Sequence, residues 1–492
     1  MSGQVIVSEL METSGVKFGT SGARGLVTDM TDLICYAYTT GFIQYLESVG
    51  ELAEKGGRIV FAGDLRSSTD RIMAAVAKAI HDRGYTPVNC GKVPSPAVAL
   101  YGLILKVPAI MVTGSHIPDD RNGIKYNKAT GEVLKSDETG MKAQEFTLPD
   151  IFDDKGMLKD AFPLTAVEPK AAELYIQRWL TAFPSDFLKG KKIGLYEHSA
   201  VGREMLYEIF TGLGAEVTKL GFSNTFLPVD TEAIRPEDVD LARSWAKEYG
   251  FDAIISTDGD SDRPLISDET GKWLRGDVAG ILGGLFYSAD IVVTPVSCNT
   301  AVEKCGAFKQ VRRTCIGSPY VIAEMMKAVA DGGQCVVGYE ANGGFLTASP
   351  IKTTTGELSA LPTRDPIIVQ LGILGLSVEK NAPVSKLLAD LPERITYSDR
   401  LQDFSSDVSN QKIKELTAGA PDSITALFPQ FGAVKDTDTT DGLRITFDSY
   451  DVVHLRPSGN APELRCYTES KTEEKAKEIN RTVLEIISSW RN

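Results

Sequence analysis

Ser115 and His116 form the first pair of neighbouring side chains that could do chemistry together. They follow the apolar residues 108–112, and Lys125 follows them after the polar residues 119–124. A serine hydroxyl presented at the end of a strand, beside an imidazole, could carry an acyl or phosphoryl group covalently. Taken alone, the pair is more typical of an ordinary polar loop, so a catalytic role depends on what the rest of the chain contains.

Three aspartates at alternate positions, Asp258, Asp260 and Asp262, follow the strand-like residues 251–256. Gly259 lets the chain turn tightly between them, which could bring the three carboxylates together. Carboxylates gathered in this way are ligands for a hard divalent cation. The segment therefore predicts a metal loop at a strand end, with a solvated acidic turn as the alternative.

The same segment partly matches the calcium loop of an EF-hand, because Glu269 stands where that loop has its last ligand. The position that needs glycine for the loop's sharp turn is Arg263, and a strand rather than a helix precedes it. An EF-hand is therefore not expected.

Two later loops carry groups that could bind a phosphorylated sugar. In the glycine-rich residues 338–345, a carboxylate and an amide could meet sugar hydroxyls, although a plain hairpin is equally consistent with these residues. The residues concerned are Glu340, Asn342 and Gly343. Residues 456–465 hold the donors that a phosphate dianion needs. These donors are Arg456, Ser458, Gly459, Asn460 and Arg465.

The first glycine-rich turn, residues 17–25, contains three glycines and Arg24. Its exposed backbone would suit an anion, although a structural turn is the more common role of such a segment. The chain has no GxxxxGK[ST] segment, so a P-loop nucleotide site is not supported.

These loops follow strands in a chain where strands and helices alternate. Strand-like residues 58–62 precede a helix that ends near residue 83, and the same order recurs at residues 191–212 and again from the strand-like residues 291–296. This alternation predicts α/β units with partly parallel sheets. Residues 147–169 lack periodicity and are expected to be a linker. From about residue 384 the pattern is β-rich and ends in an amphipathic helix that begins at Glu473.

Composition narrows the class of protein. The 492 residues suggest three or four domains at roughly 100–200 residues each. A net charge of −14 argues against nucleic acid or an anionic membrane as a partner. No apolar run approaches the roughly 18 residues that span a bilayer, and the first residues do not resemble a signal peptide. Seven scattered cysteines without a CxxC pair indicate reduced thiols and a cytoplasmic protein.

The motifs FGTSGARG, TGSHIP…NGIKY, DGDSDR, GYEANGG and RPSGNAPELR follow one another in the order found in the α-D-phosphohexomutase family. The chain resembles this family over nearly its full length. The resemblance implies three related α/β domains and a C-terminal α+β domain of TATA-binding-protein-like fold around a central cleft. We expect domains at 1–160 with the phosphoserine loop, 161–270 with the metal loop, 271–383 with the sugar loop and 384–492 with the phosphate loop.

The resemblance also implies a role for each loop. Ser115 would carry the phosphoryl group and, together with Asp258, Asp260 and Asp262, would hold one Mg²⁺ ion. Glu340, Asn342 and Gly343 would meet the sugar, and Arg456, Ser458, Gly459, Asn460 and Arg465 the phosphate that does not react. Arg24, His116, Lys125 and Arg263 would surround the reacting phosphoryl group, with His116 and Lys125 as candidates for proton transfer.

The implied enzyme is a phosphohexomutase, an isomerase that interconverts hexose 1-phosphate and 6-phosphate, with mannose or glucose as the hexose. Its activating intermediate would be a hexose 1,6-bisphosphate, and its partners would be hexose phosphates, with the chain as monomer or homodimer. Phosphoglucosamine mutase is an alternative, as is a catalytically weak sugar-phosphate-binding relative with a regulatory role.

Several residues depart from the family's pattern. Ile117 replaces an asparagine after the Ser-His pair, and in the sugar loop Asn342 and Gly344 replace a serine and a histidine. Asn460-Ala461 stand where Thr-Glu is common, and Pro319 replaces a lysine. These departures leave the serine, the three aspartates and both arginines in place, but they weaken any choice of substrate by analogy.

Overall fold

The first unit is built on a central mixed sheet. The structure, a computed structural model, describes residues 3–19, 22–52, 55–458 and 463–491. The sheet order is β2-β3-β7-β6-β4-β5, with β8 paired to β7. Its strands are β2 (Lys17–Phe18), β3 (Ala23–Leu26), β4 (Arg58–Gly63), β5 (Thr86–Lys92), β6 (Ala109–Val112), β7 (Arg121–Lys128) and β8 (Gly131–Glu132). β4 runs parallel to β5 and β6, whereas β6 and β7 are antiparallel.

Helices cover both faces of this sheet. On one face, Ile59 and Phe61 pack with α2 (Asp32–Ser48) and α3 (Thr69–Asp82). On the other face, Val60 and Ala62 pack with α4 (Ser95–Leu105). Burial on both faces explains why this strand is a continuous apolar run. The unit also contains β1 (Gln4–Ile6), α1 (Val7–Thr13), α5 (Lys135–Lys142) and β9 (Glu145–Thr147), with β1 and β9 paired antiparallel.

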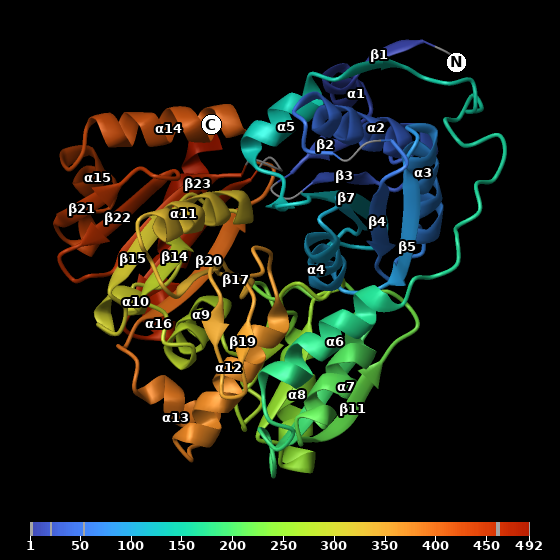
Figure 1. Cartoon of the computed structure of the whole chain (residues 1–492). Helices are drawn as coiled ribbons and strands as arrows, with labels where there is room; N and C mark the ends of the chain where they lie inside the picture. Colours follow the sequence, from blue (N-terminus) through green and yellow to red (C-terminus); the bar gives the residue numbers. More distant parts are fainter. Residues whose placement is uncertain (1–2, 20–21, 53–54, 459–462, 492) are drawn as a thin grey trace.

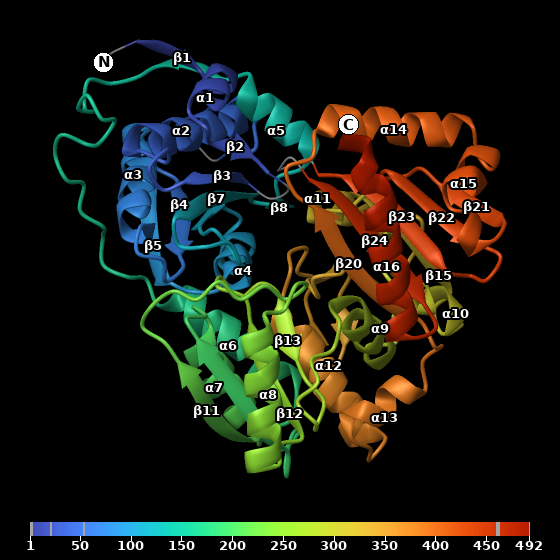
Figure 2. The ribbon, with the colours of Figure 1, turned by 180° about the vertical axis from the view of Figure 1, so that it is seen from behind.

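The expected linker follows β9. Between Thr147 and Lys170 the described chain has no helix and no strand beyond an isolated bridge from Phe152 to Leu158. Figures 1 and 2 show this segment running along the outer side of the first unit before α6 begins.

The second and third units repeat one arrangement of four strands. Their sheets have the orders β11-β10-β12-β13 and β15-β14-β16-β17, and in each only the last strand is antiparallel. The strands are β10 (Lys192–His198), β11 (Glu216–Phe222), β12 (Ala253–Thr257), β13 (Pro264–Ile266), β14 (Ile291–Pro295), β15 (Gln310–Thr314), β16 (Val336–Tyr339) and β17 (Phe345–Thr347). The strands β5-β4-β6-β7 of the first unit have the same order and directions.

Helices and two short strands complete these units. They are α6 (Lys170–Ala182), α7 (Arg203–Gly212), α8 (Pro236–Tyr249), α9 (Gly276–Phe286), α10 (Ala301–Lys304), α11 (Ser318–Ala330), β18 (Ile351–Lys352), β19 (Glu357–Leu358), α12 (Pro366–Glu379) and α13 (Val384–Ala389). No helix within the described residues is both long and apolar enough to cross a membrane.

The C-terminal unit is an antiparallel sheet with helices on one face. The order β20-β24-β23-β22-β21 joins β20 (Ile395–Leu401), β21 (Val434–Asp438), β22 (Leu443–Phe447), β23 (Val452–Pro457) and β24 (Leu464–Ser470). Apolar side chains of β22, β23 and β24 pack with those of α16 (Glu473–Ser488), and α14 (Ser406–Ala418) adds to this core. The remaining elements are α15 (Asp422–Leu427), η1 (Pro429–Phe431) and η2 (Ser489–Arg491).

The repeated arrangement places three of the predicted functional loops at one equivalent position. The Ser115 loop joins β6 to β7, the aspartate loop joins β12 to β13, and the Glu340 loop joins β16 to β17. Each is the connection from a parallel strand to the antiparallel strand beside it. The fourth loop, after Arg456, joins β23 to β24.

Candidate active site

A cleft of about 820 Å³ lies where the four units meet. Several residues that the sequence singled out line this cleft. They are Arg24 and His116 from the first unit, Arg263 from the second, Glu340 and Asn342 from the third, and Arg465 from the fourth. The fold therefore brings together side chains that lie far apart in the sequence, with Arg24 and Arg465 more than 400 positions from each other.

Ser115 lies in a turn that the surrounding residues hold in a strained conformation. Its φ of +58° is in the left-handed region, which is unusual for a residue other than glycine. Its backbone N–H donates to Thr113 Oγ1 at 2.8 Å, and its carbonyl accepts from Arg66 Nη2 at 2.7 Å. The buried carboxylate of Asp64 in turn binds both Thr113 and Arg66. The hydroxyl of Ser115 is thereby directed at Asp258 Oδ2, 2.6 Å away.

The three aspartates form a buried cluster whose ligand atoms all lie within 4.8 Å of one another. Within the described residues, one oxygen each of Asp260 and Asp262 is buried without a hydrogen-bond partner. Burial and the two neighbouring carboxylates raise the pKa of Asp258 to about 8. Hard oxygen ligands, unpartnered buried oxygens and mutual repulsion fit a divalent cation such as Mg²⁺.

Gly259 is required here for close packing rather than for a left-handed turn. A Cβ at this position would lie 2.7 Å from the carbonyl oxygen of Ser115, so the aspartate loop approaches the serine loop backbone to backbone. The left-handed residue of this loop is Ser261, with a φ of +53°. Glu269 does not join the aspartates, since its carboxylate binds Ser385, which agrees with the rejection of an EF-hand.

Lys125 and two arginines, Arg263 and Arg364, offset the negative charge of the three aspartates. Lys125 Nζ donates to Asp260 and Asp262 at 2.6 Å each, so this predicted proton-transfer residue is held at the metal loop. Burial alone would raise the pKa of Asp262, but Arg364, Lys125 and Arg263 together hold it well below its ordinary value. The Ser95 hydroxyl adds a hydrogen bond to Asp260.

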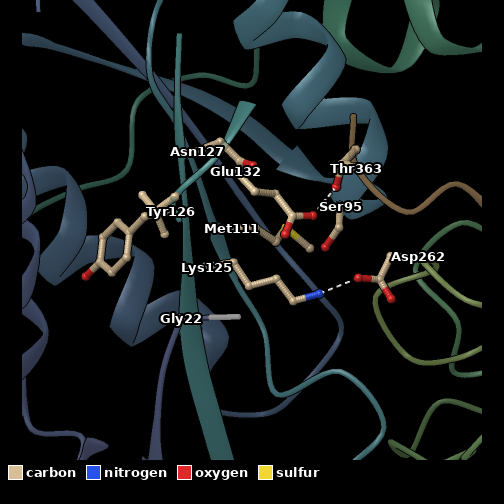
Figure 3. A pocket seen from close by; sticks show the side chains of 10 residues that line it. Gly22, Ser95, Met111, Lys125, Tyr126, Asn127, Glu132, Asp262 and Thr363 are labelled. Carbon is tan, nitrogen blue, oxygen red and sulfur yellow. Dashed lines mark hydrogen bonds and ion pairs between the residues drawn. The ribbon is translucent and has the colours of Figure 1, made fainter. Parts of the chain in front are cut away.

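Figure 3 shows the region beside Lys125 from close by. A cavity of about 20 Å³ lies here, and the lysine side chain extends toward Asp262. Glu132 at the same cavity accepts hydrogen bonds from the hydroxyls of Thr363, at 2.6 Å, and Ser318, at 2.8 Å. Glu132 therefore connects the first unit to the third unit at a cavity that Asp262 also lines.

The contacts of His116 settle which ring nitrogen carries the proton. Arg263 Nη1 lies 2.9 Å from Nδ1 and can only donate, so Nδ1 accepts and the proton of the neutral ring lies on Nε2. Nε2 faces Asp230 Oδ2 at 3.8 Å, and Nδ1 is 3.4 Å from Ser115 Oγ. Burial and Arg263 lower the pKa of His116 to about 3, so the ring is neutral at pH 7.

Arg24 lies at the same end of the cleft. Burial and two neighbouring arginines lower its pKa to about 10. Its Nε is buried without a hydrogen-bond partner among the described residues. The guanidinium is thus placed to receive an anion.

The sugar loop contains a tight turn that only glycine suits. Gly343 has a φ of +87°, and Glu340 and Asn342 flank this turn. Asn342 Oδ1 accepts from Gly344 N at 2.9 Å, and its carbonyl accepts from Thr231 of the second unit at 2.6 Å. The carboxylate of Glu340 and the amide of Asn342 line the cleft.

Arg364 is the main site residue that the motif patterns do not reveal. Its guanidinium donates to Asp262 Oδ2 at 3.0 Å and to Glu340 Oε2 at 3.2 Å, which joins the metal loop to the sugar loop. A Cβ at Gly344 would lie 2.3 Å from Arg364 Cδ, so this arginine occupies the space beside the glycine. The available signal was an arginine just before α12, where the helix dipole disfavours a cation.

The phosphate loop is only partly described. Gly459 and Asn460 lie outside the described residues, and Ser458 is buried next to them. Arg456 is turned toward Asp441, with Nε 2.8 Å from Oδ2, whereas Arg465 lines the cleft. Asp441 also accepts from Ile316 N of the third unit at 2.8 Å, so it connects the two units beside this loop.

Comparison with known proteins gives four family matches along the chain. All four are domains of the phosphoglucomutase/phosphomannomutase family: α/β/α domain I at residues 15–146, domain II at 173–271, domain III at 280–395 and the C-terminal domain at 407–486. A phosphomannomutase from Salmonella muenchen is 44% identical over 481 residues, which cover 98% of this chain and 97% of that protein. A phosphomannomutase from Sinorhizobium fredii is 41% identical over 475 residues, which cover 96% and 99%.

Solved structures share the fold. A putative phosphomannomutase from Thermus thermophilus superposes with a TM-score of 0.72 at 19% identity, over 96% of this chain and 99% of that one. An N-acetylphosphoglucosamine mutase from Aspergillus fumigatus, solved with GlcNAc-6P and magnesium, superposes with a TM-score of 0.60 at 13% identity, over 98% of both chains. The three α/β units and the C-terminal antiparallel sheet agree with the architecture expected from the sequence.

Proposed function

The chain belongs to the phosphoglucomutase/phosphomannomutase family and is a hexose-phosphate mutase, and from that premise we propose the identity of its substrate and of its catalytic groups. The proposed reaction interconverts hexose 1-phosphate and hexose 6-phosphate, with mannose phosphate preferred and glucose phosphate also accepted. Identities of 44% and 41% to phosphomannomutases over nearly the whole chain support mannose.

The observation that carries the catalytic proposal is the contact of Ser115 with the aspartate cluster. A buried hydroxyl held 2.6 Å from Asp258, in a strained turn whose next residue, His116, lines the cleft, suits a phosphoryl carrier. Asp258, Asp260 and Asp262 would hold Mg²⁺ together with an oxygen on Ser115. The ion would withdraw charge from the phosphoryl oxygens.

Transfer begins with a phosphoryl group on Ser115 Oγ. The free hydroxyl of the hexose phosphate attacks phosphorus, the bond to Oγ breaks, and a hexose 1,6-bisphosphate results. The hydroxyl proton leaves to a base at this end of the cleft and returns to the released Ser115 Oγ; of the two expected candidates Lys125 is the better one, because the Nδ1 lone pair of His116 accepts from Arg263 Nη1. Arg24 and Arg263 would neutralise the charge on the transferred group.

The reverse step uses the other phosphate of the same intermediate. After the bisphosphate turns over in the cleft, Ser115 Oγ attacks the second phosphorus and the bond to the sugar oxygen breaks. The serine proton passes to that sugar oxygen, which leaves as a hydroxyl, and the phosphoenzyme is restored. Glu340 and Asn342 would hold the sugar hydroxyls. Arg465, with Arg456 and Ser458, would hold whichever phosphate is not reacting.

Phosphoglucosamine remains a second candidate substrate. A probable phosphoglucosamine mutase from Methanothermobacter thermautotrophicus is 26% identical over 477 residues, well below the phosphomannomutases. A weakly active relative with a regulatory role is disfavoured by the complete aspartate cluster and the directed Ser115 hydroxyl. We also propose a cytoplasmic location, which the seven free cysteines support.

The test is a comparison of mannose 1-phosphate, glucose 1-phosphate and glucosamine 1-phosphate, each with Mg²⁺ and a catalytic amount of the matching bisphosphate. Formation of the 6-phosphate is expected to be fastest for mannose, and Ser115→Ala is expected to abolish it. Faster turnover of glucosamine 1-phosphate would overturn the mannose assignment, and no turnover of any of the three would overturn the mutase proposal.

A further inference from the structure

Three arginines stand side by side across the C-terminal sheet. In the strand register, Arg400 of β20 pairs with Arg465 of β24, and Arg465 pairs with Arg456 of β23. Directly paired residues of antiparallel strands point to the same face of the sheet. The sequence motif contains only the last two of these arginines, since Arg400 lies more than 50 residues earlier in the chain.

This face of the sheet is the one turned toward the cleft. Leu401 and Leu464, the neighbours of Arg400 and Arg465 in sequence, point to the opposite face and join the core under α14 and α16. Arg400 and Arg465 both line the cleft, and the side chain of Arg400 is 45% exposed. A row of like charges on directly paired positions is unfavourable unless anions face it.

Carboxylates of the C-terminal unit face this row. Glu463 lies between two of the arginines, with Oε1 3.2 Å from Arg400 Nε and Oε2 3.5 Å from Arg465 Nη2. Asp441 binds Arg456 at 2.8 Å. Glu463 thus places one carboxylate oxygen toward the guanidinium of Arg400 and the other toward that of Arg465, as a bridging phosphate would.

From this geometry we propose that Arg400 is a third phosphate-binding arginine, and that Glu463 is the anion that substrate phosphate displaces from it. The inference rests on the proposed function, because the ligand is the phosphate of the hexose phosphate or bisphosphate. A phosphate dianion brings more charge and more acceptor oxygens than one carboxylate, so it competes for both guanidinium groups.

The exchange suits a site that must hold a phosphate in two substrate orientations. Neighbouring strands lie roughly 4.8 Å apart, so the row from Arg456 to Arg400 extends about two strand spacings. A phosphate can lie at Arg465 and Arg456, or at Arg465 and Arg400, with Arg465 shared. When the phosphate leaves, Glu463 returns to the two arginines that it bridges.

The test measures phosphate binding directly, without turnover. Isothermal titration with inorganic phosphate and with mannose 6-phosphate, without Mg²⁺ and with a chelator present, is done on the whole chain and on Arg400→Gln, Glu463→Gln and the double variant. Arg481→Gln is the matched control, because this arginine lies on α16 in an exposed pair with Glu485. Loss of one charge-assisted contact is expected to weaken binding about tenfold or more for Arg400→Gln, with no change for the control.

Glu463→Gln gives the opposite sign and separates competition from a structural role. Removing the competing charge is expected to tighten phosphate binding several-fold, and the double variant is expected to lose that gain. Arg400→Gln with unchanged affinity, or Glu463→Gln with weaker affinity, would overturn the proposal. Because binding is measured without catalysis, an inactive enzyme that still shows this pattern would refute the proposed reaction while leaving the arginine row intact.

Discussion

Replacement of Arg364 by alanine is the perturbation that best tests how the site is held together. The arginine side chain is only 3% exposed and bridges Asp262 and Glu340, which are 2% and 5% exposed. Arg364→Ala would leave two buried carboxylates without this cation. Breaking a buried ion pair by removing one partner costs about 3–5 kcal/mol, which is a large part of the total stability of a typical domain.

Stability and activity are both expected to fall. The loss of about 3–5 kcal/mol of stability corresponds to a melting temperature lower by about 6–20 °C, measured by differential scanning calorimetry. Because the bridge also orients the metal and sugar loops, kcat/KM is expected to fall by at least about tenfold. Arg364→Lys should restore only part of both, since an ammonium cannot reproduce the guanidinium's fork of contacts.

The control is Lys380→Ala, just after the same helix. Lys380 pairs with Asp390 at 2.7 Å, but the two side chains are 49% and 63% exposed. An exposed pair contributes about 0–1 kcal/mol, so this variant should melt within a few degrees of the parent. Equal, small effects of Arg364→Ala and Lys380→Ala on melting temperature and activity would refute the reasoning about the buried bridge.

Three further predictions concern residues around the site. Gly259→Ala should reduce both turnover and affinity for Mn²⁺, followed by electron paramagnetic resonance, because its Cβ would lie 2.7 Å from the carbonyl of Ser115; unchanged metal affinity would contradict this. Glu132→Ala should lower the free energy of unfolding by about 1–3 kcal/mol, seen as a lower melting temperature, because its hydrogen bonds to Thr363 and Ser318 are lost. The affinity for inorganic phosphate should change less than the stability does. Burial lowers the pKa of His454 to about 4, so the unfolded chain takes up its proton first as the pH falls from about 6.5 to 4, and up to about 3 kcal/mol of stability should be lost in that window. In His454→Asn the free energy of unfolding, measured by urea titration at several pH values, should depend less on pH between about 6.5 and 4. The same pH dependence in the variant as in the parent would contradict this.

The elements were predictable where a local pattern decides them. The continuous apolar runs became the central strands, as in β4, whose residues Ile59 and Val60 are buried on opposite faces. The unpatterned linker and the closing helix α16 were also expected from composition and spacing. The family resemblance implied three related α/β domains, but the chain shows no clear sequence repeat, and the equivalent position of the three loops follows from the strand order within the sheets.

The site was predictable where one loop contains its own chemistry. The aspartates lie close together in sequence and in space, whereas Arg364, Asp230 and Arg400 reach the cleft from segments that carry no motif. Their roles depend on partners more than 50 positions away, such as Asp262 for Arg364. Such pairings are set by packing between units, which no local pattern records. Gly344, which stands where the family pattern has a histidine, lies directly beside the side chain of Arg364.

The central claim is that Ser115 carries the phosphoryl group, and intact-mass analysis tests it most directly. The purified chain is incubated with mannose 1,6-bisphosphate and Mg²⁺, freed of small molecules and weighed, and the modified peptide is then mapped by fragmentation. The account predicts a gain of one phosphoryl group on Ser115 and no gain in Ser115→Ala. A phosphoryl group on another residue, or one that persists in Ser115→Ala, would contradict it.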